Sequence, residues 1–193
     1  LLVRASESRK VKELNLREAP ANIIGGFASS LLVFALYAII LRIFGMYRIG
    51  SVSFDGTALL EKFCFCLLVA VGEEVLCRGI MFRLVAQCSN ITVALLVSSL
   101  IFGFMHIPNP NATLWSGIAI AVEAGLLLGA AYAFSGSLWM PIGLHWMWNF
   151  TEGNLLGTPV SGMDFGPSVI TPDISGPELL TGGAFGPENS VIT

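Results

Sequence analysis

Long apolar stretches separated by short polar turns dominate the chain between residues 23 and 150. A helix of about 20 apolar residues is long enough to cross the hydrocarbon core of a bilayer. The pattern predicts five apolar helices, over residues 23–46, 57–86, 91–107, 114–134 and 138–150. The sequence therefore indicates an all-α fold, a polytopic transmembrane helical bundle with about five spanning helices in this fragment.

The two ends of the chain differ from this apolar core of residues 23–150. Residues 1–22 are polar and charged, and residues 151–193 are rich in glycine and proline and lack lysine and arginine. We expect the second stretch to be a non-cytoplasmic tail that precedes a missing last helix. It is either an ordered loop, which its phenylalanine and leucine residues favour, or a loosely held segment. Since the chain starts with Leu1, we expect it to be a fragment.

Composition supports a membrane protein. Hydrophobic residues make up 54% of the chain and charged residues 12%, with a mean hydropathy of +0.77, which does not suit a soluble surface. All ten lysines and arginines lie at or before Arg83. Five precede the first apolar helix: Arg4, Arg9, Lys10, Lys12 and Arg17. The positive-inside rule therefore predicts a cytoplasmic N-terminal segment, and the same distribution argues against a nucleic-acid partner.

The cysteines do not suggest a metal or redox site. All four lie in or beside apolar helices and lack metal-ligand spacing: Cys64, Cys66, Cys77 and Cys88. We interpret them as small apolar residues that pack between helices.

Charged residues within the apolar region are the first candidates for chemistry. Glu73, Glu74 and Arg78 lie in the second predicted helix, where an ionisable group costs roughly 3 kcal/mol and is functional by default. Glu74 and Arg78 are four residues apart and face one another on a helix, whereas Glu73 is rotated by about 100°. Arg78 can therefore neutralise one carboxylate while the other serves as an acid or base. The alternative is a purely structural ion pair.

The chain has only two histidines, His106 and His145, and both lie in apolar helical sequence. Asn149 follows His145 by four residues, so the two side chains can direct hydrogen-bond donors toward one point, as an oxyanion requires. The alternatives for each histidine are a hydrogen-bonded core residue or a proton relay. Together with the acidic pair, these residues predict one polar site shared by three helices.

Helix depth conflicts with that shared site. If the helices alternate cleanly across the bilayer, Glu73 lies near its middle and His106 near the outer end of its helix. His145 then lies between the middle and the cytoplasmic side. We therefore expect tilted or broken helices.

Three motifs follow one another on successive apolar helices: Glu73-Glu74-x-x-x-Arg78, Phe102-x-x-x-His106 and His145-x-x-x-Asn149. In this order they resemble the motifs of the CPBP family, the CAAX prenyl protease and bacteriocin-processing intramembrane endopeptidases. The resemblance covers about residues 58–150. The Gly/Pro-rich tail is also similar to segments that precede a last helix in bacterial members.

The resemblance implies a helical membrane bundle that hydrolyses a peptide bond within it. It implies that Glu73 and His106 activate a water molecule, and that His145 and Asn149 stabilise the tetrahedral oxyanion. It also implies supporting residues, with Glu74 and Arg78 holding this arrangement and Phe102 packing beneath it.

The family has been described both as metalloproteases and as glutamic proteases. The chain lacks a His-Glu-x-x-His zinc helix, and the neutral amide of Asn149 is a poor zinc ligand. We therefore expect a glutamate mechanism without a cofactor. The alternative is a zinc ion held by Glu73, His106 and His145.

Two functions of other classes remain open. One is a non-catalytic bacteriocin-immunity or scaffold protein of the same fold, against which the complete set of motif residues argues. The other is a transporter that relays protons. The sequence pattern lacks the pair of broken half-helices that would mark its substrate site, which argues against this function. As partners, the resemblance implies membrane lipid and a protein or peptide substrate, lipidated or not. It also implies an integral protein of the bacterial cytoplasmic membrane.

Overall fold

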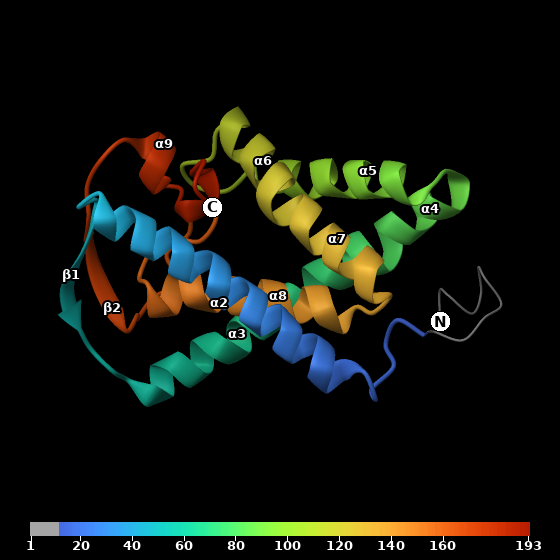
Figure 1. The fold of residues 1–193 in the computed structure, drawn as a ribbon, viewed down its shortest axis with the longest axis horizontal. Helices are drawn as coiled ribbons and strands as arrows, with labels where there is room; N and C mark the ends of the chain where they lie inside the picture. Colours follow the sequence, from blue (N-terminus) through green and yellow to red (C-terminus); the bar gives the residue numbers. More distant parts are fainter. Residues whose placement is uncertain (1–11) are drawn as a thin grey trace.

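The computed structural model describes residues 12–193, which form a mostly helical bundle joined by one pair of strands (Figure 1). In chain order the elements are α2 (Ala19–Ile43), β1 (Tyr47–Val52), α3 (Gly56–Glu74), η1 (Val75–Phe82), α4 (Arg83–Cys88), α5 (Ile91–Phe104), α6 (Leu114–Ile120), η2 (Ala121–Gly125), α7 (Leu126–Ser135), α8 (Trp139–Asn149), η3 (Phe150–Leu155), β2 (Ile170–Ile174), α9 (Glu178–Thr181) and η4 (Pro187–Asn189). The elements η1, η2 and η3 are π-helical, and η4 is a 3₁₀-helix. The basic residues Arg4, Arg9 and Lys10 lie outside the described residues.

Two helical runs in the described chain are long and apolar enough to cross a membrane. Ala19–Ile43 has 25 residues with a mean hydropathy of 2.3, and Leu114–Ser135 has 22 residues with a mean hydropathy of 1.8. The expectation of about five spanning helices is not confirmed. The helix α5 has only 14 residues and α8 only 11, and charged side chains interrupt the apolar character of the run from α3 to α4.

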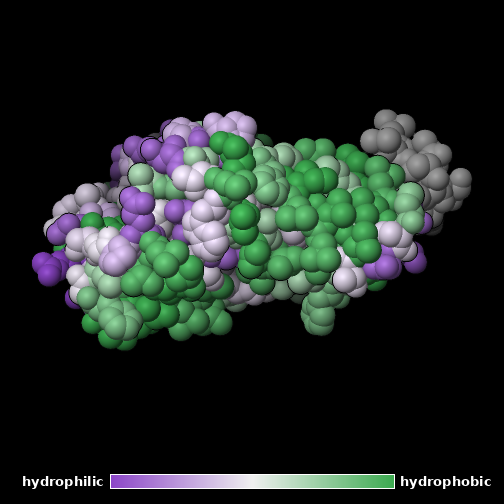
Figure 2. All heavy atoms as spheres, turned by 90° about the horizontal axis from the view of Figure 1, so that it is seen from above, coloured by the Kyte–Doolittle hydropathy of each residue, from purple (hydrophilic) through white to green (hydrophobic). Residues whose placement is uncertain are grey.

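The helix α8 lies within the bundle and packs against α2, α3 and α7 (Figure 1). Most of its side chains are buried, including both motif residues that it carries. The opposite face of α2 exposes Ile24, Leu32 and Leu36. Figure 2 shows a broad hydrophobic surface, with hydrophilic residues gathered mainly toward the end of the molecule that carries β1 and β2. Such a surface suits contact with lipid.

Glycine allows α2 and α8 to approach closely. A Cβ added at Gly26 would lie 2.6 Å from the carbonyl oxygen of Met140 and would also collide with the backbone nitrogen of Leu144. On the facing helix, a Cβ at Gly143 would lie 2.8 Å from the backbone of Ile23. Backbone atoms cannot move aside as flexible side chains do, so both positions require glycine.

We therefore expect Gly26→Ala to lower the free energy of unfolding by about 1–3 kcal/mol, because an added methyl group forces two helices apart. Gly72→Ala is the matched control, since a Cβ at this helical glycine meets no atom within 4 Å. The control should leave stability unchanged or raise it by up to about 1 kcal/mol. Thermal unfolding in detergent measures both variants. Equal melting temperatures would contradict the close α2–α8 packing.

The C-terminal segment packs back on the bundle. β2 pairs antiparallel with β1, from Tyr47 opposite Ile174 to Val52 opposite Ile170. Phe185 is buried in the same hydrophobic cluster as α2 and α8 residues, and the Tyr37 hydroxyl donates to the carbonyl of Thr181 at 2.8 Å. Of the two alternatives for this segment, the structure shows the ordered one. Its non-cytoplasmic location and a following helix stay predictions.

Candidate active site

The acidic pair lies where the geometry of its helix changes. Glu73 and Glu74 are the last residues of α3, and the chain continues directly into the π-helical η1. A π-helix inserts extra residues into helical turns, shifts the side chains that follow, and is frequent at functional sites. Arg78 lies within this π-helical segment.

Glu74 and Arg78 form a fully buried ion pair. The Arg78 Nη1 donates to the Glu74 Oε1 at 2.7 Å, and both side chains have 0% exposure. The second terminal nitrogen, Nη2, donates to the carbonyl oxygen of Gly125 at 3.0 Å. The guanidinium carbon also lies 4.5 Å from the centre of the Phe102 ring, as in a cation–π contact. Arg78 thus connects three of the helical segments around the site.

His145 is held by the same carboxylate. Its Nδ1 lies 2.9 Å from the Glu74 Oε1. An ionised carboxylate only accepts hydrogen bonds, so this nitrogen carries a proton and donates. The other ring nitrogen, Nε2, lies 3.9 Å from the Glu73 Oε2. Glu74 therefore orients the ring, while the second nitrogen faces Glu73.

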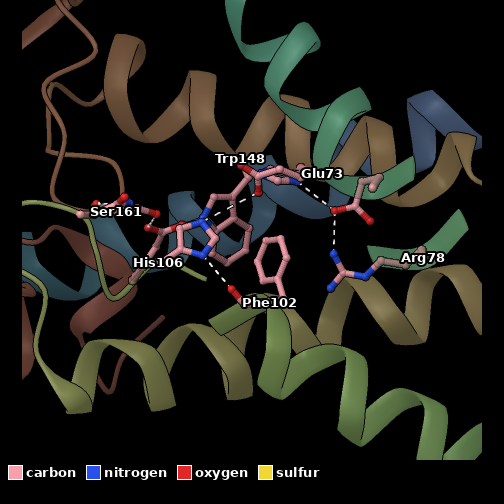
Figure 3. A network of polar contacts seen from close by, with 10 residues as sticks. Glu73, Arg78, Phe102, His106, Trp148 and Ser161 are labelled. Atoms are coloured by element: carbon pink, nitrogen blue, oxygen red, sulfur yellow. Dashed lines mark hydrogen bonds and ion pairs between the residues drawn. The ribbon is translucent and has the colours of Figure 1, made fainter. Parts of the chain in front are cut away.

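His106 approaches Glu73 from the end of α5. Its Nδ1 lies 2.8 Å from the carbonyl oxygen of Phe102, to which it donates, and its Nε2 lies 3.8 Å from the Glu73 Oε2. One carboxylate oxygen therefore lies within 4 Å of both imidazole rings. Figure 3 shows Glu73 and Arg78 on one side of His106, with the Phe102 ring between His106 and Arg78.

All four residues for which catalytic roles were predicted line one cavity of about 300 Å³: Glu73, His106, His145 and Asn149. Asn149 is 4% exposed, and its side-chain amide forms no hydrogen bond within the described part of the chain. A buried amide that bonds no protein group but borders a cavity is free to bond a ligand there.

Phe102 packs against both histidines, as expected of a residue beneath the site. Its ring centre lies 5.0 Å from that of His106 and 5.7 Å from that of His145, edge-to-face in the second case. The ring is 2% exposed. It therefore fixes the positions of both imidazoles while keeping water away from Arg78.

The sequence model of the type II CAAX prenyl endopeptidase Rce1-like family matches residues 55–151, which is half of the chain. The chain belongs to this family. The matched range contains all three motifs and ends just after Asn149, so the suspected kinship with CAAX prenyl proteases is confirmed. Comparisons with curated proteins and with solved structures give no match. Membership implies a membrane-embedded protease.

The residues that would hold zinc in this Rce1-like protein are Glu73, His106 and His145. Among residues 12–193, no group of three or more histidine, cysteine, aspartate or glutamate side chains is arranged to hold a metal ion. In the predicted zinc set, the Glu73 Oε2 lies 3.8 Å from one Nε2 and 3.9 Å from the other. The four cysteines are free, and two of them are buried.

The structure adds residues to the Rce1-like site that the motifs did not indicate. Trp148, Ser161 and Glu188 also line the cavity. The indole of Trp148, on α8, donates a hydrogen bond to Glu188 of the C-terminal segment. The position of Trp148 beside Asn149 could have suggested its role. The other two residues lie in the Gly/Pro-rich tail, where no local pattern distinguishes them.

Proposed function

We propose that this chain is an intramembrane endopeptidase in which Glu73 and His106 activate a water molecule to attack a peptide bond. The observation that carries the proposal is the position of the Glu73 Oε2 near both Nε2 atoms, at 3.8 Å and 3.9 Å, within one cavity. These distances are too long for direct hydrogen bonds but can be bridged by a water molecule.

The hydrogen bond of His106 to Phe102 supports this role. Because Nδ1 donates to a carbonyl oxygen, the opposite nitrogen of a neutral ring is free to bind the attacking water. Glu73 takes a proton from that water as its oxygen bonds to the substrate carbonyl carbon. The proton then passes to the amine nitrogen as the C–N bond breaks, and the products are a carboxylic acid and an amine.

Asn149 and His145 would stabilise the oxyanion. The amide of Asn149 can donate from Nδ2, and His145 can donate from Nε2 while its Nδ1 donates to Glu74. Donation from both ring nitrogens requires an imidazolium, whose charge the two neighbouring carboxylates offset. Arg78 offsets part of their negative charge and keeps Glu74 in place.

The apolar walls of the cavity support an apolar substrate segment near the cleaved bond. Besides the polar site, its lining includes Phe65, Val69, Met105, Leu128, Val160, Met163 and Phe165. The family is that of type II CAAX prenyl endopeptidases. A lipidated protein or peptide is therefore a suitable substrate, as is an unmodified apolar peptide.

We favour a metal-free mechanism for this chain. Asn149 offers a neutral amide, which is a poor zinc ligand but a good oxyanion donor. In the alternative, Glu73, His106 and His145 would hold zinc, which would polarise the carbonyl and activate water. The deciding experiment incubates the purified protein with a strong chelator, removes the chelator by dialysis, and follows cleavage of quenched fluorescent peptides. Unchanged rates support the glutamate mechanism, and loss restored by zinc supports a metal.

Asn149→Ala is expected to lower kcat about 10²–10³-fold with a smaller change in KM, because an oxyanion donor acts mainly in the transition state. Steady-state kinetics with the same peptides measures both constants. Asn22→Ala is the control, because Asn22 in the first turn of α2 makes only an exposed hydrogen bond to its own helix. A normal kcat for the Asn149 variant would contradict the oxyanion role. Absence of any cleavage by the wild type would favour a non-catalytic scaffold.

A further inference from the structure

The active-site cavity has a second polar end, formed by the C-terminal segment. Ser161 and Glu188 line it, and Figure 3 shows Ser161 on the side of His106 away from Glu73. The Glu188 Oε1 accepts a hydrogen bond from the Trp148 indole at 3.1 Å, and its Oε2 accepts one from the Ser161 hydroxyl. The proposed mechanism uses none of these groups.

The loop that carries Ser161 is fixed by the rest of the bundle. Ser161 has a positive φ of 48°, which is uncommon for a residue other than glycine. Its carbonyl oxygen accepts a hydrogen bond from Asn109, three residues after His106, and the amide of Gly162 donates to the carbonyl of Phe185. A backbone held in a rare conformation from two sides is typical of a functional constraint. The backbone at this polar end of the cavity is therefore held in place by hydrogen bonds to two other segments.

Two further carboxyl groups lie behind Glu188, outside the cavity lining. Glu188 is 4% exposed, and behind it Glu152 is fully buried with no hydrogen bond to either carboxylate oxygen. Glu123, on the π-helical η2, contributes a third carboxyl group whose Oε2 is buried without a partner. The three carboxyl groups are close enough to interact electrostatically.

Three basic side chains of the described residues pair with other acids. Arg78 pairs with Glu74, Lys62 with Glu61, and Arg83 with Glu13. No ion pair within residues 12–193 involves Glu188. Buried charges are normally paired, so Glu188 lines the apolar cavity as a buried carboxyl group with no basic side chain of the described residues beside it.

We propose that the Ser161–Glu188 end of the cavity is a subsite for a positively charged lysine or arginine side chain of the substrate, close to the cleaved bond. This inference rests on the proposed endopeptidase function. The long aliphatic stem of such a side chain suits the apolar walls, while its charged group reaches the carboxylate of Glu188. A metal ion is a poorer occupant, because no group of three metal-ligating side chains is assembled among the described residues.

The test is a panel of quenched fluorescent peptides cleaved by the purified full-length protein. Each position flanking the cleaved bond carries in turn lysine, glutamine, norleucine or glutamate. At one position we expect kcat/KM for lysine to exceed that for norleucine by about tenfold or more, as for a hydrogen bond to a charged group. The glutamine peptide tests a neutral hydrogen-bond donor, and its kcat/KM should be close to that of the norleucine peptide. The glutamate peptide should have the lowest kcat/KM.

Variants assign the preference to Glu188. Glu188→Gln should lower kcat/KM for the lysine peptide at least tenfold more than for the norleucine peptide, whereas Glu188→Asp should retain part of the preference. Glu178→Gln, an exposed glutamate of the neighbouring α9, is the control and should leave both rates unchanged. Thermal unfolding of each variant identifies a folding defect, which would lower the rates for all peptides alike.

The outcomes separate the subsite from the protease. Efficient cleavage by the wild type with equal rates for lysine, glutamine and norleucine overturns the subsite and leaves the endopeptidase intact. A lysine preference that survives in well-folded Glu188→Gln also overturns it. If the wild type cleaves no peptide in the panel, and Glu73→Gln behaves identically, the endopeptidase function fails and the subsite fails with it.

Discussion

Glu73→Gln is expected to lower kcat/KM for peptide cleavage by about 10³-fold. The substitution keeps the size of the side chain but removes the group that accepts a proton from water, and general acid–base groups contribute about 10²–10⁴-fold. The side chain of Glu73 is 30% exposed and its Oε2 makes no hydrogen bond in the described structure, so its replacement breaks no ion pair within hydrogen-bonding distance. The measurement is steady-state cleavage of a quenched fluorescent peptide.

The matched control for this prediction is Glu61→Gln on the same helix. The Glu61 side chain is 75% exposed and lies 3.9 Å from Lys62, an exposed contact that contributes little. The control should retain wild-type kinetics, and both variants should keep the wild-type melting temperature. If well-folded Glu73→Gln retained more than about a tenth of the activity, outside the range for a general base, the assigned role of Glu73 would be wrong.

Arg78→Leu should lower the free energy of unfolding by about 3–5 kcal/mol, because it leaves the carboxylate of Glu74 buried without its cation. Both partners have 0% exposure, and the guanidinium also satisfies the carbonyl oxygen of Gly125. Arg78→Lys keeps the charge but cannot present two terminal nitrogens to two acceptors, so we expect a smaller loss. Chemical or thermal unfolding in detergent measures both variants.

A double-mutant cycle separates the ion pair from simple loss of packing. Glu74→Gln combined with Arg78→Leu removes both charges, so the double variant should be more stable than the sum of the two single losses predicts. Strict additivity would show that the two side chains do not stabilise one another. Activity should fall in both variants that carry Glu74→Gln, because His145 loses the carboxylate that orients its ring.

Three π-helical segments lie beside the residues that meet at the cavity. Arg78 lies in η1, Gly125 ends η2, and Asn149 is followed directly by η3. In each case the irregular turn lies at the cavity or at a hydrogen bond that supports it. The sequence pattern required tilted or broken helices, and π-helical turns are the form that the break takes in two long helical runs.

The helical segments and the candidate catalytic residues could be predicted from the sequence for simple physical reasons. Apolar stretches of this length can satisfy their backbone groups only as helices in a membrane. Ionisable residues within them are rare enough to identify a site, and the spacing of four residues places Glu74 beside Arg78 and His145 near Asn149 on common faces. The motifs therefore indicated which residues line the cavity without any knowledge of the fold.

Long-range packing determined the remaining features. The pairing of β1 with β2, the return of the C-terminal segment, and the contacts of Trp148 and Ser161 with Glu188 join residues separated by up to 144 positions. No local periodicity encodes such contacts, because they depend on which surfaces meet once the helices have packed. Local sequence thus determined the helices and the proposed reacting groups, whereas tertiary packing alone brought Ser161 and Glu188 to the cavity.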